Sequence, residues 1–460
     1  MKLKRGFLCL HLGAGYHSDS KSSAYKELCN QAIKIGVDLL NQSKSCIEVA
    51  TAVTSHLENS PLTNAGFGSN LTQDDSVECE AAIMESNENK FAAVGCVKEI
   101  WNPIQAAEIV LREQKRHDLG LVPPMVLVGD HVAKKAMEMN LKTIENKILV
   151  STKAQKDFVK FQNRLNAISS GGKTLKRTRE GSKTTFDESS SVKQSKFDPL
   201  SSDFECSTIR AVDGLESPIN STESLPSKEN VISNESSETF EDSRNHSGLF
   251  VNDQSRNSTL QTELKPPISS AHFSDIDVSF SDTEDLISDT IGVICVDHDF
   301  NVASAISSGG LAMKQPGRLG PCTSFGAGCW SFTYAENTTI SACCSGTGEA
   351  IIRTHLAQNA CDFLYRDPGN ILKLDSFIND YFTSSRLVPD HLEPRLCGLL
   401  LVTLSKNKDG RKAMIDFQLV HTADSFCVSY ISAGEKEANF MISRLKSEER
   451  VVTKAFHFSI

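Results

Sequence analysis

The residues best suited to chemistry in this chain are Asp289 and Thr290, which lie where the composition of the sequence changes abruptly. A long stretch rich in Ser, Asn, Asp and Glu precedes them, and the strand-like run IGVICVD (291–297) follows. A threonine inside a chain has no base of suitable pKa nearby, whereas at a chain start its α-amino group, with a pKa of about 7.7–8.0, supplies one. We therefore predict that the chain cuts its own Asp289–Thr290 bond and that Thr290 becomes a nucleophile.

The predicted cut begins with attack of the Thr290 Oγ on the Asp289 carbonyl, followed by an N→O acyl shift and hydrolysis of the ester. Release of this bond requires strain and oxyanion donors supplied by the folded domain. In the cut chain, the amine takes the Oγ proton and later returns it to the leaving amine, directly or through a water. One residue then acts as nucleophile and base, so no histidine is required.

Other catalytic centres are not indicated by the sequence. It contains no P-loop, no GxGxxG after a strand, no HExxH and no GxSxG. None of the twelve histidines has ligand spacing to a partner, and we interpret His11, His298 and His421 as surface or satisfied core residues. The sequence therefore predicts no metal and no cofactor.

The bulk composition narrows the class of protein. A chain of 460 residues has room for one large domain or two ordinary ones, and a net charge of −10 argues against a general nucleic-acid binder. Fourteen cysteines without a CxxC pair are typical of small apolar core residues in a reducing compartment. No apolar run is long enough to cross a membrane, and the first apolar run is expected to be a strand rather than a signal peptide.

Apolar periodicity predicts strands and helices on both sides of a polar insert. Residues 1–150 and 290–460 are predicted to form the two parts of one hydrolase domain, and residues 151–289 a mostly disordered linker with a possible helix at 153–165. The basic cluster 173–179 is either a solvated patch or a nuclear-import signal. Strands are expected at 6–12, 77–84, 91–97, 123–129, 398–405, 413–421 and 426–432, with two more after Thr290 and one before Ser345; helices are expected at 22–42, 45–58, 103–115 and 130–140 and from Glu349.

Several glycine-rich and polar motifs occur along this chain. They are HLGAGYHSDSK (11–21), NSPLTNAGFGSN (59–70), SDTIGVICVDHDFNVASAISSGG (288–310), KQPGRLG (314–320), GAGCW (326–330), SGTGE (345–349) and HTADSFCVSYIS (421–432). In these motifs and their order the chain resembles the N-terminal-nucleophile asparaginase-type hydrolases, which include family-2 asparaginases and aspartylglucosaminidases. The resemblance implies an α/β (α+β) fold, a four-layer αββα sandwich carrying a long disordered insert.

The resemblance also implies roles for individual residues. Thr290 corresponds to the nucleophile, with Asp289 before the cut bond, and Ser308 to a second hydroxyl that hydrogen-bonds the nucleophile. Arg318 corresponds to the arginine that holds a substrate carboxylate through its planar fork. The other implied site residues are the oxyanion donors Ser345 and Gly346, the pocket loop from Gly13 to Gly15, and the active-site-facing Asn64 and Lys21.

Departures from the family pattern bear on the substrate. Small-molecule asparaginases resembling this chain have an Asp that holds the substrate α-ammonium where this chain has Pro321, which cannot do so. We therefore predict a self-processing threonine endopeptidase that cleaves proteins after Asp. An asparaginase or isoaspartyl-peptide hydrolase with the same nucleophile is the alternative, and a non-catalytic interaction protein a third hypothesis. Glu80 and Ala82 replace an expected Asp and Ser, which affects only local geometry.

The expected partners follow from the resemblance. They are protein substrates with Asp at the cut, among them nuclear regulatory proteins, so we expect the protein in nucleus and cytoplasm. The two cleaved parts are expected to stay together and to pair as a dimer of heterodimers. No membrane and no direct nucleic-acid contact are expected.

Overall fold

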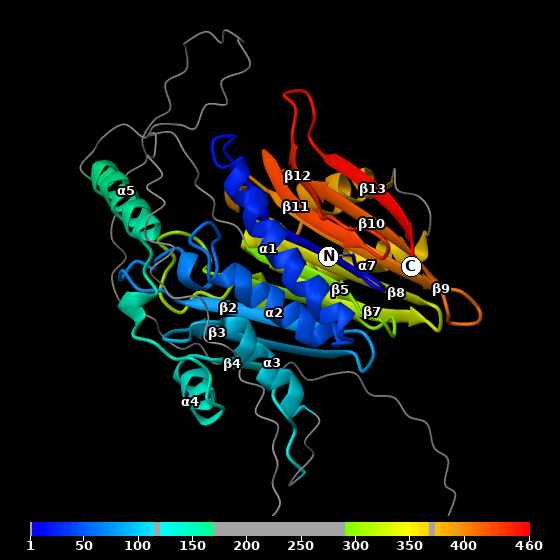
Figure 1. Cartoon of the computed structure of the whole chain (residues 1–460). Coiled ribbons are helices and arrows are strands. Elements are labelled where there is room, and N and C mark those ends of the chain that lie inside the picture. Colours follow the sequence, from blue (N-terminus) through cyan, green and yellow to red (C-terminus); the bar gives the residue numbers. More distant parts are fainter. Residues whose placement is uncertain (1, 115–119, 170–289, 368–372, 393) are drawn as a thin grey trace, which may run out of the picture. The chain divides into compact units, whose positions relative to one another are not determined.

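The computed structural model describes residues 2–114, 120–169, 290–367, 373–392 and 394–460 (Figure 1). These residues belong to one compact unit, formed from both sides of the predicted insert. Asp289 and the basic cluster 173–179 lie outside the described residues, as does most of the predicted linker. The first part of the predicted linker is a helix, α5 (Thr152–Ser169).

The larger sheet draws its strands from both predicted parts of the domain. Across the sheet their order is β12-β11-β1-β5-β6-β2-β3-β4, and neighbours are antiparallel except for the parallel pair β3 and β4. Strand β1 thus lies between two strands from the C-terminal part. The strands are β1 (Phe7–Gly15), β2 (Cys79–Glu85), β3 (Lys90–Val97), β4 (Val126–Val128), β5 (Ile291–Val296), β6 (Val302–Ser308), β11 (Ser425–Ser432) and β12 (Asn439–Arg444).

The smaller sheet is antiparallel throughout and comes only from the C-terminal part. Its order is β13-β10-β9-β8-β7. The strands are β7 (Cys329–Ala335), β8 (Thr338–Gly346), β9 (Cys397–Lys406), β10 (Ala413–His421) and β13 (Val452–Ser459).

Helices cover the outer face of each sheet, so the unit has four layers, helix–sheet–sheet–helix (Figure 1). Strand β1 illustrates how one sheet contacts two layers, because successive side chains of a strand point to opposite faces of the sheet. Leu8 and Leu10 pack in the cluster shared with α1 and α2, whereas Phe7 and Cys9 pack in the cluster shared with the smaller sheet. This confirms the predicted αββα sandwich. The helices are α1 (Ser22–Asn41), α2 (Cys46–Glu58), α3 (Pro103–Glu113), α4 (Asp130–Glu138) and α5 over the larger sheet, and α6 (Gly348–Thr354), α7 (Leu356–Arg366) and α8 (Lys373–Phe377) over the smaller.

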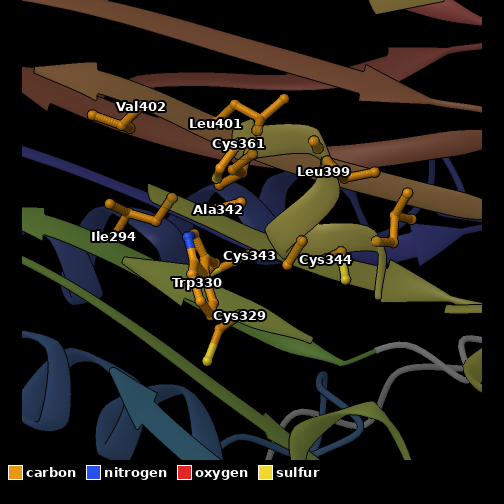
Figure 2. Close-up of a cluster of buried hydrophobic side chains, with 14 of the residues drawn as sticks. Ile294, Cys329, Trp330, Ala342, Cys343, Cys344, Cys361, Leu399, Leu401 and Val402 are labelled. Atoms are coloured by element: carbon orange, nitrogen blue, oxygen red, sulfur yellow. The ribbon is translucent and has the colours of Figure 1, made fainter. Parts of the chain in front are cut away.

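The smaller sheet packs through a dense apolar cluster that includes several cysteines. Figure 2 shows Trp330 and Cys329 of β7, Cys343 and Cys344 of β8, and Cys361 of α7 in this cluster. Every described cysteine is free, and all but Cys96 are buried. Burial raises the pKa of the Cys329 and Cys397 thiols to about 12. All of the described cysteines except the partly exposed Cys96 thus serve as small apolar core residues, as predicted from the sequence.

The structure departs from the expected elements at a few places. The helix expected from Glu349 is broken at His355, whose left-handed φ of 43° separates α6 from α7. Strands β12 and β13 have no counterpart among the expected elements, because their mixed polar pattern suits edges of sheets. In the described part of the chain, no helix combines the length and apolar character needed to cross a bilayer.

Candidate active site

Thr290 and Ser308 occupy facing positions at one end of the β5–β6 hairpin. Ile291 pairs with Ser307, so the next pair outward in the antiparallel register is Thr290 opposite Ser308. Facing residues of such a pair direct their side chains to the same face, about 5 Å apart at Cβ. Thr290 is 7% exposed and Ser308 2%. The sheet register thus brings together the predicted nucleophile and its predicted hydroxyl partner.

The ends of the two sheets meet beside this pair. Gly13, Ala14 and Gly15 end β1, and the Ala14 N–H donates to the Ser345 Oγ of β8 at 3.2 Å. Gly346 has a left-handed φ of 138°, and a Cβ there would lie 2.1 Å from the Leu396 carbonyl oxygen. Only glycine fits this position. The predicted pocket loop and the predicted oxyanion donors are therefore in contact.

Arg318 already binds a carboxylate of its own chain. Its Nε and Nη2 both lie 2.8 Å from the Glu349 Oε1 at the start of α6. A Cβ on Gly348 would lie 2.5 Å from Nη2, so this glycine makes room for the guanidinium; a Cβ on Gly310 would lie 3.4 Å from Nη1 and 3.0 Å from the Lys314 Nζ. The geometry suits carboxylate binding. That this carboxylate belongs to a substrate stays a prediction.

A second carboxylate, Glu80, lies on the other side of Arg318. It pairs with Ser308 across β2 and β6 and is 2% exposed. Its Oε2 accepts from the Gly320 N–H at 2.6 Å, whereas its buried Oε1 has no hydrogen-bond partner among the described residues. A Cβ on Gly320 would lie 2.2 Å from Oε1 and 3.0 Å from the Arg318 Nη1. In the sequence Glu80 is only a local departure from the family pattern, because its place opposite Ser308 follows from the strand register.

Asn64 holds the loop that follows Ser308. Its Nδ2 donates to the Gly310 carbonyl at 2.9 Å, its Oδ1 accepts from the Asn70 N–H at 2.8 Å, and its carbonyl accepts from the Gly309 N–H at 2.8 Å. Ser308 Oγ accepts from the Gly310 N–H at 3.0 Å in the same loop. Asn64 thus supports the site through the backbone, and a direct substrate contact stays a prediction.

The remaining predicted residues lie near the edges of this arrangement. Lys21 is buried immediately before α1, and its place in the substrate site stays a prediction. Pro321 begins a buried 3-10 turn. A Cβ built on Gly348 would touch the Arg318 guanidinium and would also lie 3.2 Å from the Pro321 Cδ, so the proline ring is close to the guanidinium. The group next to Arg318 at this position is therefore an uncharged ring.

Behind the site, Glu58 at the end of α2 supports β6 from the helix side. Its Oε1 accepts from the Ser307 Oγ at 2.7 Å and from the Ile104 N–H of α3 at 3.0 Å. Burial raises the pKa of Glu58 to about 8, against the lowering effect of these donors. The carboxyl is largely protonated at neutral pH.

His11 is the residue whose interpretation from sequence was wrong. It is buried on β1 and pairs with Gly292, which follows Thr290 by two residues on β5. Its Nε2 has no hydrogen-bond partner among the described residues. It is therefore not a satisfied core histidine. A histidine directly before a glycine-rich loop was the available signal. For metals, no group of three or more described His, Cys, Asp or Glu side chains could hold an ion.

The helix–sheet–sheet–helix sandwich has the architecture of the N-terminal-nucleophile hydrolases, and Thr290 stands directly before β5 of its larger sheet. The asparaginase family profile matches residues 4–192 and 201–370, and the chain belongs to this family. It is 22% identical over 354 residues to an isoaspartyl peptidase of Escherichia coli (strain K12), covering 76% of this chain and 74% of the relative. It is 27% identical over 356 residues to a putative isoaspartyl peptidase/L-asparaginase of Dictyostelium discoideum, covering 76% of each.

Proposed function

We propose that the chain is a self-processing threonine endopeptidase of the threonine aspartase (taspase) type, which cleaves proteins after Asp. The observation that carries this proposal is the uncharged Pro321 ring beside Arg318. A substrate whose α-amine lies in a peptide bond presents no ammonium, so a site without a partner at this position suits it. The carboxylate that Arg318 holds is then the side chain of the Asp before the cut.

The proposed reaction uses groups that the fold brings to one end of the sandwich. Thr290 Oγ attacks the carbonyl carbon of the substrate Asp, and the neutral α-amine of Thr290 takes the Oγ proton. Backbone donors at Ser345 and Gly346 stabilise the oxyanion. The C–N bond breaks as the proton passes to the leaving amine, which leaves an ester on Thr290 that water then hydrolyses. Ser308 donates its hydroxyl hydrogen toward Thr290 Oγ throughout.

The substrate carboxylate has to approach Arg318 from the edge that Glu349 leaves open. Glu349 accepts a hydrogen bond from Nε and lies 2.8 Å from Nη2, but Nη2 has no hydrogen-bond partner among the described residues, and Nη1 faces Gly310 and Gly320. The Lys314 Nζ also lies close by, 3.0 Å from a Cβ built on Gly310. Selectivity for Asp would then depend on the planar donor geometry of the guanidinium.

The second candidate is an isoaspartyl peptidase or asparaginase with the same nucleophile. The names of the relatives favour it, since the matched proteins of Escherichia coli and Dictyostelium discoideum are called isoaspartyl peptidases. One observation in this chain also supports it. The unpartnered Oε1 of Glu80 lies beside Arg318 and could hold a free α-ammonium in place of the missing Asp at position 321.

Two measurements separate these candidates. Intact-mass spectrometry of the purified protein should find two fragments, the smaller beginning at Thr290; a chain that stays uncut under all conditions would exclude both. The cut protein is then given a peptide with blocked ends and an internal Asp, a β-aspartyl dipeptide, and free asparagine. Cleavage of the blocked peptide after Asp supports the endopeptidase, and turnover of the other two alone supports the second candidate. Pro321→Asp should shift the preference toward substrates with a free ammonium.

Assembly and localisation complete the proposal. Because β1 pairs with β5 and β11, the two parts would share one sheet after the cut and remain together. We propose that two such cut pairs associate. The basic cluster 173–179 would direct the protein to the nucleus, where regulatory proteins are its substrates.

A further inference from the structure

Glu349 contacts a single edge of the Arg318 guanidinium. Its Oε1 lies 2.8 Å from both Nε and Nη2, and it accepts a hydrogen bond from Nε. A guanidinium carries five N–H donors in a fixed planar fork, and each of its two Nη nitrogens directs one N–H away from Nε. These two N–H groups form the end edge of the guanidinium. The Glu349 carboxylate therefore occupies the Nε–Nη2 edge and leaves the end edge open.

The other carboxylate beside this arginine does not hold it. Glu80 accepts from the Gly320 N–H through Oε2, whereas its Oε1 has no hydrogen-bond partner among the described residues. The Arg318 Nη2 is likewise buried without a hydrogen-bond partner in the described part of the chain. Of the two carboxylates, Glu349 is thus the one that fixes the direction of the guanidinium, and a buried donor remains for a further acceptor.

The end edge of the guanidinium lies beside the loop that follows Ser308. A Cβ built on Gly310 would lie 3.4 Å from the Arg318 Nη1, and the Gly310 N–H donates to the Ser308 Oγ at 3.0 Å. Glu349 approaches from α6 instead, next to Gly348, where a built Cβ would lie 2.5 Å from Nη2. The nitrogen that Glu349 does not contact is therefore the one nearest to the proposed nucleophile pair.

We propose that Glu349 is a positioning residue for Arg318: it holds the Nε–Nη2 edge so that the end edge, Nη1 and Nη2, faces the substrate carboxylate. The inference rests on the proposed function of the site and applies to either substrate class, because both present a carboxylate. An arginine side chain loses much rotamer freedom when it is fixed. A guanidinium that is already held before the substrate arrives avoids this loss on binding and can form both hydrogen bonds at once.

The pair of Glu108 and Arg112 on α3 provides a matched control within the same chain. The Glu108 Oε1 lies 3.0 Å from the Arg112 Nε and 2.6 Å from its Nη2, so one oxygen again meets the Nε–Nη2 edge. The Arg112 side chain is 63% exposed, against 16% for Arg318. The two pairs share their contact geometry, but only the pair at Arg318 adjoins the proposed site.

The kinetic test measures KM and kcat of the cut protein for the substrate that it turns over. Glu349→Ala should raise KM about 10-fold and keep kcat within about twofold of wild type, because a guanidinium that is not held binds the carboxylate less well in ground state and transition state alike. Glu349→Gln keeps an acceptor for Nε and should return KM to within about threefold of wild type. Glu108→Ala should leave both constants unchanged. A KM that is unchanged or lower in Glu349→Ala would overturn the inference, since a lower value means that Glu349 competes with the substrate.

A double-mutant cycle separates an effect through Arg318 from a general effect on the fold. In the Arg318→Ala background, Glu349→Ala should change kcat/KM by less than about twofold, because the group that Glu349 holds is already absent. If the loss kept its full size in that background, Glu349 would act through another residue or through the fold, which contradicts the inference. Failure of the proposed function is seen separately, as a wild-type chain that is not cut at Thr290.

Discussion

The β5–β6 hairpin has two ends that differ in how their buried carboxylates are hydrogen-bonded. At the turn, the buried Asp297 accepts from the N–H groups of Asp299 and Asn301 at 3.0 Å and of Cys46 at 3.1 Å, although the neighbouring His298 Nδ1 has no partner among the described residues. Near the open end, the His11 Nε2 and the Glu80 Oε1 are buried without partners among those residues. The carboxylate at the turn thus stabilises the fold through both of its oxygens, whereas the carboxylate at the open end keeps one oxygen that a substrate could use.

The largest effect on activity is expected from Thr290→Ala, at the open end of the hairpin. Removal of Oγ should abolish self-cleavage and lower turnover by at least about 10⁴-fold, because no other group can form the ester. The melting temperature should fall only slightly relative to the uncut wild-type chain, since only one hydroxyl and one methyl group are lost. Intact mass and peptide assays measure this, with Thr290→Ser as the control that keeps a hydroxyl. If Thr290→Ala turned over substrate at the wild-type rate, another residue would have to be the nucleophile.

At the turn, Asp297→Ala should have the reverse effect. Three backbone N–H groups lose their acceptor, which should destabilise the protein by about 3 kcal/mol or more. Thermal unfolding in the uncut Thr290→Ala background measures the loss, and kcat of the cut Asp297→Ala protein should stay near the wild-type value. If Asp297→Ala instead lowered kcat strongly and left stability unchanged, the turn would have a catalytic role and the two ends would not differ as proposed.

Arg318→Ala should weaken binding of the substrate carboxylate. We expect kcat/KM to fall about 30- to 100-fold, mainly through KM, because a charge-assisted hydrogen-bonded contact is lost. Arg318→Lys keeps the charge without the planar fork and should recover only part of the loss. If Asp preference were the same in Arg318→Ala, the carboxylate would be held by another residue. Steady-state kinetics on peptides with Asp or Asn before the cut measures this preference.

The smallest effect concerns the pH dependence of stability through Glu58. Its pKa in the folded protein is raised to about 8, so the folded state holds the proton more tightly than the unfolded chain. The associated stability is complete below the unfolded pKa of about 4.3 and is lost as pH rises through 8. Glu58→Gln should therefore remove roughly 2 kcal/mol of stability change between pH 6 and pH 9. Melting curves across this range test it, and unchanged pH dependence in the variant would assign the effect to another group.

Much of the fold could be predicted because local patterns and global packing agree. The stripes of α1 and α2 and the apolar runs of β1, β2, β3 and β5 have the periods of the elements they form. The break at His355 could not be predicted, since a left-handed residue is imposed by packing of α6 and α7 on the sheet. Edge strands β12 and β13 were missed because half of their surface faces solvent.

The sequence by itself determined the chemistry proposed for Thr290, because after the proposed cut its hydroxyl and α-amine would belong to one residue and would require no distant partner. It also determined the family, through motifs whose order along the chain is preserved. Only the tertiary structure decided that Ser308 faces Thr290, that Glu349 and Glu80 flank Arg318, and that His11 lies over Gly292. These contacts join residues far apart in the chain. Strand register and sheet packing set them, and no local pattern encodes either.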